Sequence, residues 1–197
     1  LGTLMVVQPS VAQLDGALKR REAAAQTRQA LWIAIALAVP FFLLCYFSQP
    51  LLTAFDIDPA IVPTAAAYLR AMSWGAPGLC LVFLMRFFSE GTGHTRPTML
   101  YGVTGALLNI PLNYVLMFGK LGVPAMGTVG VGYATSIVIW LQFLMLFFYI
   151  RSHRHYEPFE LMSQLEKPNW GEIWSLLKVG VPIAIAIFVE GSLFVMA

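Results

Sequence analysis

The chain has 197 residues, of which 58% are hydrophobic and only 11% are charged, with a formal net charge of +2. Its mean hydropathy is +0.73, a balance that ordinary soluble domains do not show, so composition excludes a soluble domain. The small net charge and the lack of a basic patch interleaved with aromatic residues argue against a nucleic-acid-binding protein. We therefore predict an all-α polytopic membrane protein.

Long apolar runs follow one another along the chain, separated by short polar links. A run of about 20 residues is long enough to cross the hydrocarbon core of a bilayer as a helix. The predicted spans cover residues 1–18, 30–55, 64–88, 98–118 and 127–150, and a sixth begins at residue 179. Because the sequence starts at Leu1 and both of its ends fall inside apolar runs, we interpret it as a fragment of a longer protein.

The predicted span 98–118 carries two amides in an otherwise apolar segment. Asn109 and Asn113 stand four residues apart, so they share one helical face, and Pro111 between them removes one backbone hydrogen bond. In lipid these polar groups need partners inside the protein. Two interpretations remain open: the asparagines join neighbouring helices, or they bind a substrate or an ion.

Residues 151–178 form the one polar stretch of any length, and we interpret it as a connector at the membrane surface, because aromatic residues lie among its charges. The distribution of basic residues predicts its side. Ten of the 12 lie in one set of connections, which is therefore expected to be cytoplasmic, whereas Arg70 and Lys120 lie in the opposite set with the acidic turn at Asp56 and Asp58. The ten are Lys19, Arg20, Arg21, Arg28, Arg86, Arg96, Arg151, Arg154, Lys167 and Lys178.

Glu190 is the one acidic residue that the sequence places inside a span, about a dozen residues into the last apolar run. Burying an ionised carboxylate at the centre of a bilayer costs about 2.5–3.5 kcal/mol on insertion scales, so such a group is retained for a partner or a use. Glu190 could take up and release a proton or bind a monovalent cation. The alternative is a structural carboxylate that is hydrogen-bonded to a neighbouring helix.

Other side chains give weaker signals. His94, His153 and His155 fall in predicted loops without a cluster of carboxylates or thiolates, so we interpret them as solvated and predict no metal site. Cys45 and Cys80 lie in apolar runs, where a thiol behaves as a small hydrophobic group. The sequence has no phosphate-binding loop of the GxxxxGK[ST] type.

Six stretches in order along the chain resemble the multidrug and toxic compound extrusion (MATE) family, in its NorM-like bacterial branch. They are GTLMVVQPSVAQLDGA, YLRAMSWGAPG, MRFFSEGTGHTRPTM, LLNIPLNYVLMFGKLG, GTVGVGYATSIVIW and KVGVPIAIAIFVEGSLF. The resemblance implies a transporter of twelve helices in two lobes around a central cavity. This chain would supply part of helix 2, helices 3 to 6 and the start of helix 7. Residues 1–150 would then be an incomplete N-terminal lobe, 151–178 the cytoplasmic link between the lobes and 179–197 the start of the C-terminal lobe.

The resemblance also implies roles for individual residues. Glu190 matches the acidic residue of helix 7 that is associated with cation coupling, and Asn109 and Asn113 match asparagines of helix 5 that surround an aspartate of helix 1. Helix 1 is not part of this sequence. Thr135 matches a polar position of helix 6 that faces the cavity. Gln8 departs from the family pattern, which often has a small hydroxyl residue before the proline.

The function expected from this resemblance is secondary active multidrug efflux. Organic cations or amphipathic drugs would be exported by alternating access in exchange for H⁺ or Na⁺, with a possible Na⁺ site at Glu190. We expect a monomer in the bacterial cytoplasmic (inner) membrane that is not an enzyme and needs no cofactor. Two alternatives remain: a lipid-linked saccharide flippase of the same superfamily, and a membrane-embedded enzyme.

Overall fold

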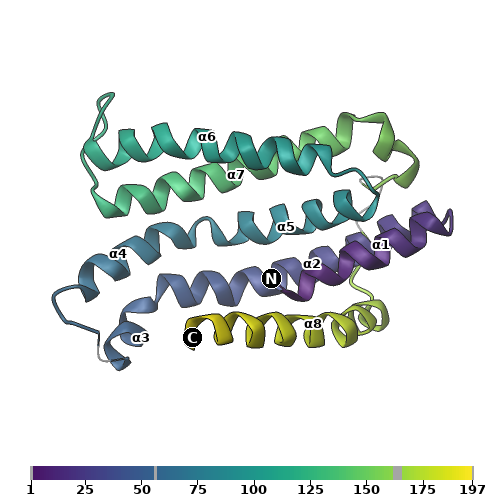
Figure 1. Cartoon of the computed structure of the whole chain (residues 1–197), viewed down its shortest axis with the longest axis horizontal. Helices are drawn as coiled ribbons and strands as arrows, with labels where there is room; N and C mark the ends of the chain where they lie inside the picture. Colours follow the sequence, from purple (N-terminus) through teal and green to yellow (C-terminus); the bar gives the residue numbers. More distant parts are fainter. Residues whose placement is uncertain (1, 56, 162–165, 197) are drawn as a thin grey trace. The chain divides into compact units, whose positions relative to one another are not determined.

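The computed structural model describes residues 2–55, 57–161 and 166–196, and every regular element in these ranges is a helix. Figure 1 shows their order along the chain. The elements are η1 (Gly2–Val6), α1 (Val7–Gly16), α2 (Arg20–Tyr46), α3 (Ser48–Ala54), α4 (Val62–Ser73), α5 (Ala76–Gly91), α6 (Arg96–Phe118), α7 (Thr128–Ser152), η2 (Arg154–Phe159) and α8 (Trp170–Met196). Asp56 of the predicted acidic turn lies outside the described residues.

Four of the described helices are long and apolar enough to cross a membrane: α2, α6, α7 and α8. A fifth span arises if α4 and α5, which meet at a bend of 48°, are counted together. The all-helical membrane architecture predicted from composition is therefore confirmed.

The break between α4 and α5 follows the glycine and proline positions of the sequence. Trp74 and Gly75 separate the two helices, and Pro77 stands in the first turn of α5, where its missing N–H costs nothing. The carbonyl oxygen of Trp74 accepts a hydrogen bond from the indole Nε1 of Trp140 on α7 at 2.9 Å. The indole N–H thus takes the place of the backbone N–H that would bond to this carbonyl oxygen in a continuous helix.

Helix ends differ from the predicted limits of the apolar runs. α2 begins at Arg20 and α8 at Trp170, whereas the predicted spans begin at residues 30 and 179. At α8 the side chain of Asn169 accepts a hydrogen bond from the backbone N–H of Gly171 at 3.1 Å, which caps the helix within the predicted connector. The predicted first run, 1–18, forms η1 and α1.

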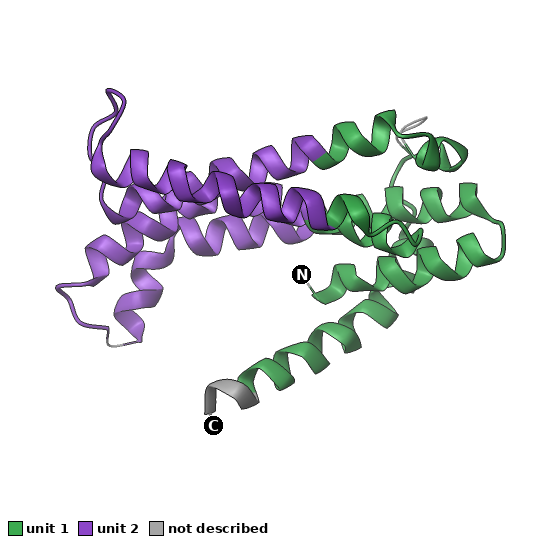
Figure 2. Ribbon diagram, turned by 45° about the horizontal axis from the view of Figure 1, so that its top comes forward, with its two compact units in different colours: residues 1–35, 83–98, 146–197 green, residues 36–82, 99–145 purple. Residues whose placement is uncertain are grey.

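The chain forms two compact units, coloured separately in Figure 2. Unit 1 comprises residues 1–35, 83–98 and 146–197, and unit 2 comprises residues 36–82 and 99–145. Helices α2, α5, α6 and α7 each contribute residues to both units. The division at residues 150 and 178 that the family resemblance implies stays a prediction.

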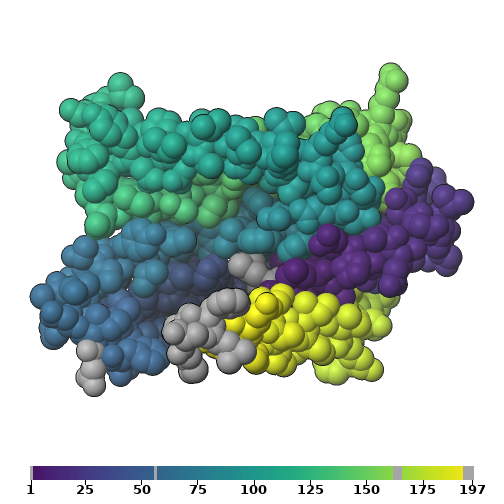
Figure 3. Space-filling view, viewed as in Figure 1, coloured from purple at the N-terminus to yellow at the C-terminus, as the bar shows by residue number. Residues whose placement is uncertain are grey.

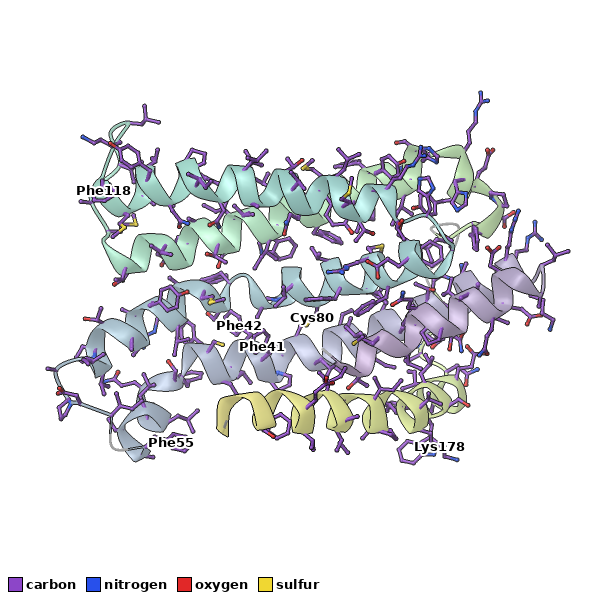
Figure 4. All side chains as sticks on the ribbon, viewed as in Figure 1. Phe41, Phe42, Phe55, Cys80, Phe118 and Lys178 are labelled. Carbon is purple, nitrogen blue, oxygen red and sulfur yellow. The ribbon has the colours of Figure 1, made fainter. Side chains whose placement is uncertain are left out.

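In unit 1, α8 packs on η1 at the start of the chain, as Figure 3 shows for the yellow and purple atoms. Glycines allow this close approach. A Cβ at Gly180 would lie 2.6 Å from the carbonyl oxygen of Thr3, and one at Gly2 would lie 2.8 Å from the Cα of Ala184. Leu176 of α8 is buried, whereas Lys178 is exposed and points outward (Figure 4).

The segment that precedes α8 is held on α2, also within unit 1. Gln29 is only 2% exposed; its Nε2 donates to the carbonyl oxygen of Lys167 at 3.0 Å, and its Oε1 accepts from the N–H of Asn169 at 2.8 Å. Beside it, Arg28 forms an ion pair with Glu166. We call this set, Arg28 and Gln29 with residues 166–169, the connector clamp.

In unit 2, α7 contacts both α4 and α6. The hydroxyl of Ser136 donates to the carbonyl oxygen of Ala71 at 3.0 Å, and a Cβ at Gly132 would lie 2.8 Å from the carbonyl oxygen of Tyr68. On the side that faces α6, a Cβ at Gly130 of α7 would lie 2.6 Å from the carbonyl oxygen of Leu116. Gly130 and Gly132 therefore allow close backbone contact between α7 and both neighbouring helices.

We predict that Gly130→Ala destabilises the protein, because its new methyl group would meet the backbone of Leu116, which cannot move as a side chain can. The expected loss is about 1–3 kcal/mol, the usual cost of overpacking. Gly102→Ala on α6 is the matched control, since a Cβ there meets nothing within 4 Å. Thermal unfolding in detergent measures both variants, and equal unfolding temperatures would contradict the packing described for α6 and α7.

Candidate functional site

A stripe along α6 carries the two asparagines of that helix. Tyr101, Gly105, Asn109 and Asn113 follow at intervals of four residues, so they share one helical face. The first two are buried and the two asparagines are half-buried. Gln142 of α7 lies over Gly105, and its Nε2 donates to the carbonyl oxygen of Tyr101 at 3.3 Å. The start of the stripe is therefore turned towards α7.

The two asparagines bond to each other. Nδ2 of Asn113 donates to Oδ1 of Asn109 at 2.6 Å, along the axis of α6. Within the described ranges, no hydrogen bond joins either side chain to a second helix, and Oδ1 of Asn113 is buried without a partner. Because a buried unpaired carbonyl oxygen is costly, it is a candidate ligand for a donor or a cation.

Pro111 adds a second acceptor near this pair. α6 continues unbroken through Pro111. Because proline has no N–H, the carbonyl oxygen of Leu107, four residues earlier, lacks its usual helical donor. The spacing of Asn109, Pro111 and Asn113 thus places unpaired oxygen atoms in the middle of an apolar helix.

Thr135 lies on α7 and is half-buried. Its hydroxyl donates to the carbonyl oxygen of Val131 at 2.9 Å, one turn earlier in the same helix. Its hydrogen is therefore used within α7, and only its lone pairs remain available. Thr135 stands seven residues, or two turns, before Gln142, on nearly the same face of the helix.

Glu190 lies on α8, in unit 1. Its side chain is exposed, and none of the described residues gives it a hydrogen bond or an ion pair. The carboxylate is thus accessible among the described residues. Asn109, Asn113 and Thr135 belong to unit 2, and the grouping of all four residues in one cavity stays a prediction.

The three histidines differ from the solvated loops predicted for them. His94, His153 and His155 are half-buried and pack against one another, with ring centroids 4.7–6.5 Å apart. Across the part of the chain that the structure describes, no three or more His, Cys, Asp or Glu side chains are arranged to hold a metal ion. Sequence reasoning missed this cluster, although the flanking Tyr149 and Tyr156 indicate a packed aromatic segment.

Comparison with known proteins identifies relatives over nearly the whole chain. The MatE family model matches residues 1–115. "Probable multidrug resistance protein NorM" of Xanthomonas campestris pv. campestris is 42% identical over 195 residues, which are 99% of this chain and 43% of that protein. "Multidrug resistance protein MdtK" of Yersinia pestis (strain Pestoides F) is 38% identical over 194 residues, which are 98% of this chain and 42% of that protein.

A solved structure of the MATE transporter NorM-NG, in complex with a monobody, superposes with a TM-score of 0.80 at 29% identity. The match covers 98% of this chain and 42% of that one. The chain therefore spans less than half the length of the proteins it matches.

We predict that Asn109 and Asn113 are energetically coupled. In a double-mutant cycle of Asn109→Ala and Asn113→Ala, the coupling free energy is expected to be about 0.5–1.5 kcal/mol, the net value of one hydrogen bond. The control cycle combines Asn113→Ala with Thr104→Ala, because the hydroxyl of Thr104 bonds instead to Leu100 at 2.8 Å. Reversible unfolding in detergent provides the energies. Additive effects in both cycles would show that the asparagines act independently.

Proposed function

This chain belongs to the MatE family, and on that premise we propose that it forms part of a secondary active multidrug efflux transporter. The transporter exports organic cations or amphipathic drugs by alternating access, in exchange for H⁺ or Na⁺ that flows inward. The observation that carries this proposal is the 42% identity to a probable multidrug resistance protein over 99% of this chain. The similarity to a second multidrug resistance protein, at 38% identity, also supports drugs as the substrate class.

The proposal assigns the charge of the coupling site to Glu190. Its carboxylate is exposed and lacks a partner among the described residues. It can therefore bind the coupling ion, H⁺ or Na⁺, or attract an organic cation, but it cannot hold the ion and the organic cation at the same time. A transported drug and a driving ion must each favour a different facing of the cavity, because a ligand shifts a conformational equilibrium only by its differential affinity. Competition at one carboxylate provides that difference.

Asn109 and Asn113 supply neutral oxygen atoms in this proposal. The hydrogen bond between them fixes the direction of both amides, and Oδ1 of Asn113 remains available. Thr135 contributes lone pairs from α7. Secondary transporters commonly place their substrate and coupling-ion sites near the middle of the bilayer.

The remaining parts of the proposal concern the context of the protein. We place it in the bacterial cytoplasmic (inner) membrane as a monomer, with residues 151–178 on the cytoplasmic side. It requires no enzymatic activity and no cofactor other than the coupling ion.

The test measures efflux of a fluorescent organic cation from liposomes that contain the complete transporter, under an imposed H⁺ or Na⁺ gradient. We expect one gradient to drive efflux by the native protein. Glu190→Gln is expected to reduce gradient-driven efflux at least about fivefold, the lower end of typical coupling between two ligands. The matched control is Glu172→Gln, which removes a carboxylate from the first turn of the same helix.

Two outcomes would contradict the proposal. If neither gradient drives efflux by the native protein, secondary active drug export is wrong. If Glu190→Gln keeps the native rate and both variants insert normally, the carboxylate is structural, and the coupling role assigned to it is wrong.

A further inference from the structure

A cluster of three histidines and two tyrosines lies at one end of unit 1. His94 belongs to the loop between α5 and α6, and it meets His153, His155, Tyr149 and Tyr156 from the end of α7 and from η2. Its ring stacks on His155 with centroids 4.7 Å apart, and it lies 5.2 Å from the ring of His153. We call these five residues the histidine cluster.

Hydrogen bonds join the two sides of the histidine cluster. Nε2 of His94 lies 3.2 Å from the hydroxyl of Tyr149. The hydroxyl of Ser89, at the end of α5, donates to the carbonyl oxygen of His94 at 2.8 Å and lies 2.6 Å from the hydroxyl of Tyr156. The ring of His94 is therefore bonded to the end of α7, and its backbone carbonyl is joined through Ser89 to Tyr156 of η2.

The histidine cluster rests on an apolar floor. The floor consists of Phe88, which is 0% exposed, and Phe159, which is 1% exposed. Tyr156 is the most deeply buried ring of the cluster itself, at 3% exposed. Phe88 meets Phe159 edge to face with centroids 5.5 Å apart and also contacts Tyr156 at 5.9 Å. A charge that appears on a ring above this floor is poorly solvated on one side.

The charged groups around His94 disfavour a proton on it. Burial, followed by His155, His153 and Arg96, lowers the pKa of His94 below its ordinary value of about 6.5. Arg151 and Arg154 stand beside His153 on the same segment.

The neighbouring carboxylates of α5 and of the end of η2 already bind arginines. Glu90 pairs with Arg86 at 2.8 Å, and Glu160 pairs with Arg21 at 2.7 Å. Glu157 lies exposed on η2. The surroundings of His94 are therefore predominantly positive.

We propose that the histidine cluster is a proton-binding site that releases η2 from the α5–α6 loop as the pH falls. Neutral imidazoles stack, whereas a proton on His94 places a positive charge beside Arg96 and beside the rings of His155 and His153, whose centroids are about 5 Å away. The contact is complete above the ordinary histidine pKa, and it weakens as the pH falls through the lowered pKa of His94. The distribution of basic residues predicts that this end faces the cytoplasm.

The connector clamp limits the effect of release to one end of the link between α7 and α8. Gln29 binds the backbone of Lys167 and Asn169, and Arg28 pairs with Glu166. These contacts contain no histidine. An acidic cytoplasm would therefore release the start of η2 from the α5–α6 loop, while Glu160 after η2, which Arg21 and Arg28 bind, and the α8 end of the link stay on α2. This switch goes beyond the proposed transport function, and it does not depend on Glu190.

The test uses a nitroxide spin label on the complete protein in nanodiscs, with Cys45 and Cys80 replaced by serine. The label is attached at Glu157→Cys on η2 or, as the matched control, at Lys167→Cys in the connector clamp; both native side chains are exposed. Continuous-wave spectra are recorded from about pH 7.5 to about pH 5.5, a range that brackets the ordinary histidine pKa.

At residue 157 we expect the mobile fraction of the spectrum at least to double on acidification, with a midpoint below about pH 6.5. At residue 167 we expect no change. His94→Gln and His94→Asn, each combined with the label at residue 157, should abolish the pH response, because neither new side chain ionises. Two independent variants guard against a misfolded single variant.

The proposal is overturned if the label at residue 157 has the same mobility across the pH range. It is equally overturned if both histidine variants keep the native response, or if residue 167 becomes mobile in parallel with residue 157. The first result would show a rigid contact, and the last would show general loosening of unit 1 by acid. Each outcome can occur whether or not drug efflux depends on Glu190.

Discussion

Lipid offers no hydrogen bonds to a polypeptide backbone, and this constraint determines the structure described above. A chain that crosses the hydrocarbon core must pair its N–H and C=O groups within helices, and it tolerates unpaired polar atoms only where protein or water surrounds them. The described residues accordingly form helices joined by short links. Exceptions in the described helices include the carbonyl oxygen freed by Pro111, Oδ1 of Asn113 and the carboxylate of Glu190. These groups are the candidate ligands of the proposed transport site.

Helix packing follows from the same constraint. Because lipid tails are as apolar as leucine, helices gain little from burying apolar surface and associate through close backbone contact and interhelical hydrogen bonds. Gly130 and Gly132 of α7 allow that contact, and Ser136 and Trp140 donate to carbonyl oxygens of α4 and of the residue after it. The bend between α4 and α5 is tolerated because an indole N–H reaches the carbonyl oxygen of Trp74.

Hydropathy predicts the central part of each helix well and its ends poorly. The spans predicted at 98–118 and 127–150 correspond to α6 and α7 within a few residues, because apolarity there continues almost to the helix ends. α2 and α8 begin earlier than predicted, since their first turns are polar. In α2, Arg20, Arg21 and Arg28 pair with Asp15, Glu160 and Glu166, respectively. In α8, Asn169 caps a helix that hydropathy assigns to a connector.

The candidate site was predictable only as far as local spacing reaches. Four-residue spacing placed Asn109 and Asn113 on one face, and the structure adds their mutual hydrogen bond. The histidine cluster was not predicted, because Ser89 and Tyr156 are 67 residues apart in sequence and periodicity reports only on neighbouring turns. The most direct test of the transport mechanism is equilibrium binding of a fluorescent organic cation to the complete transporter at increasing Na⁺ and at decreasing pH. Competition at Glu190 predicts that the apparent Kd rises in proportion to the concentration of the coupling ion. A Kd that is unaffected by either ion would contradict the mechanism.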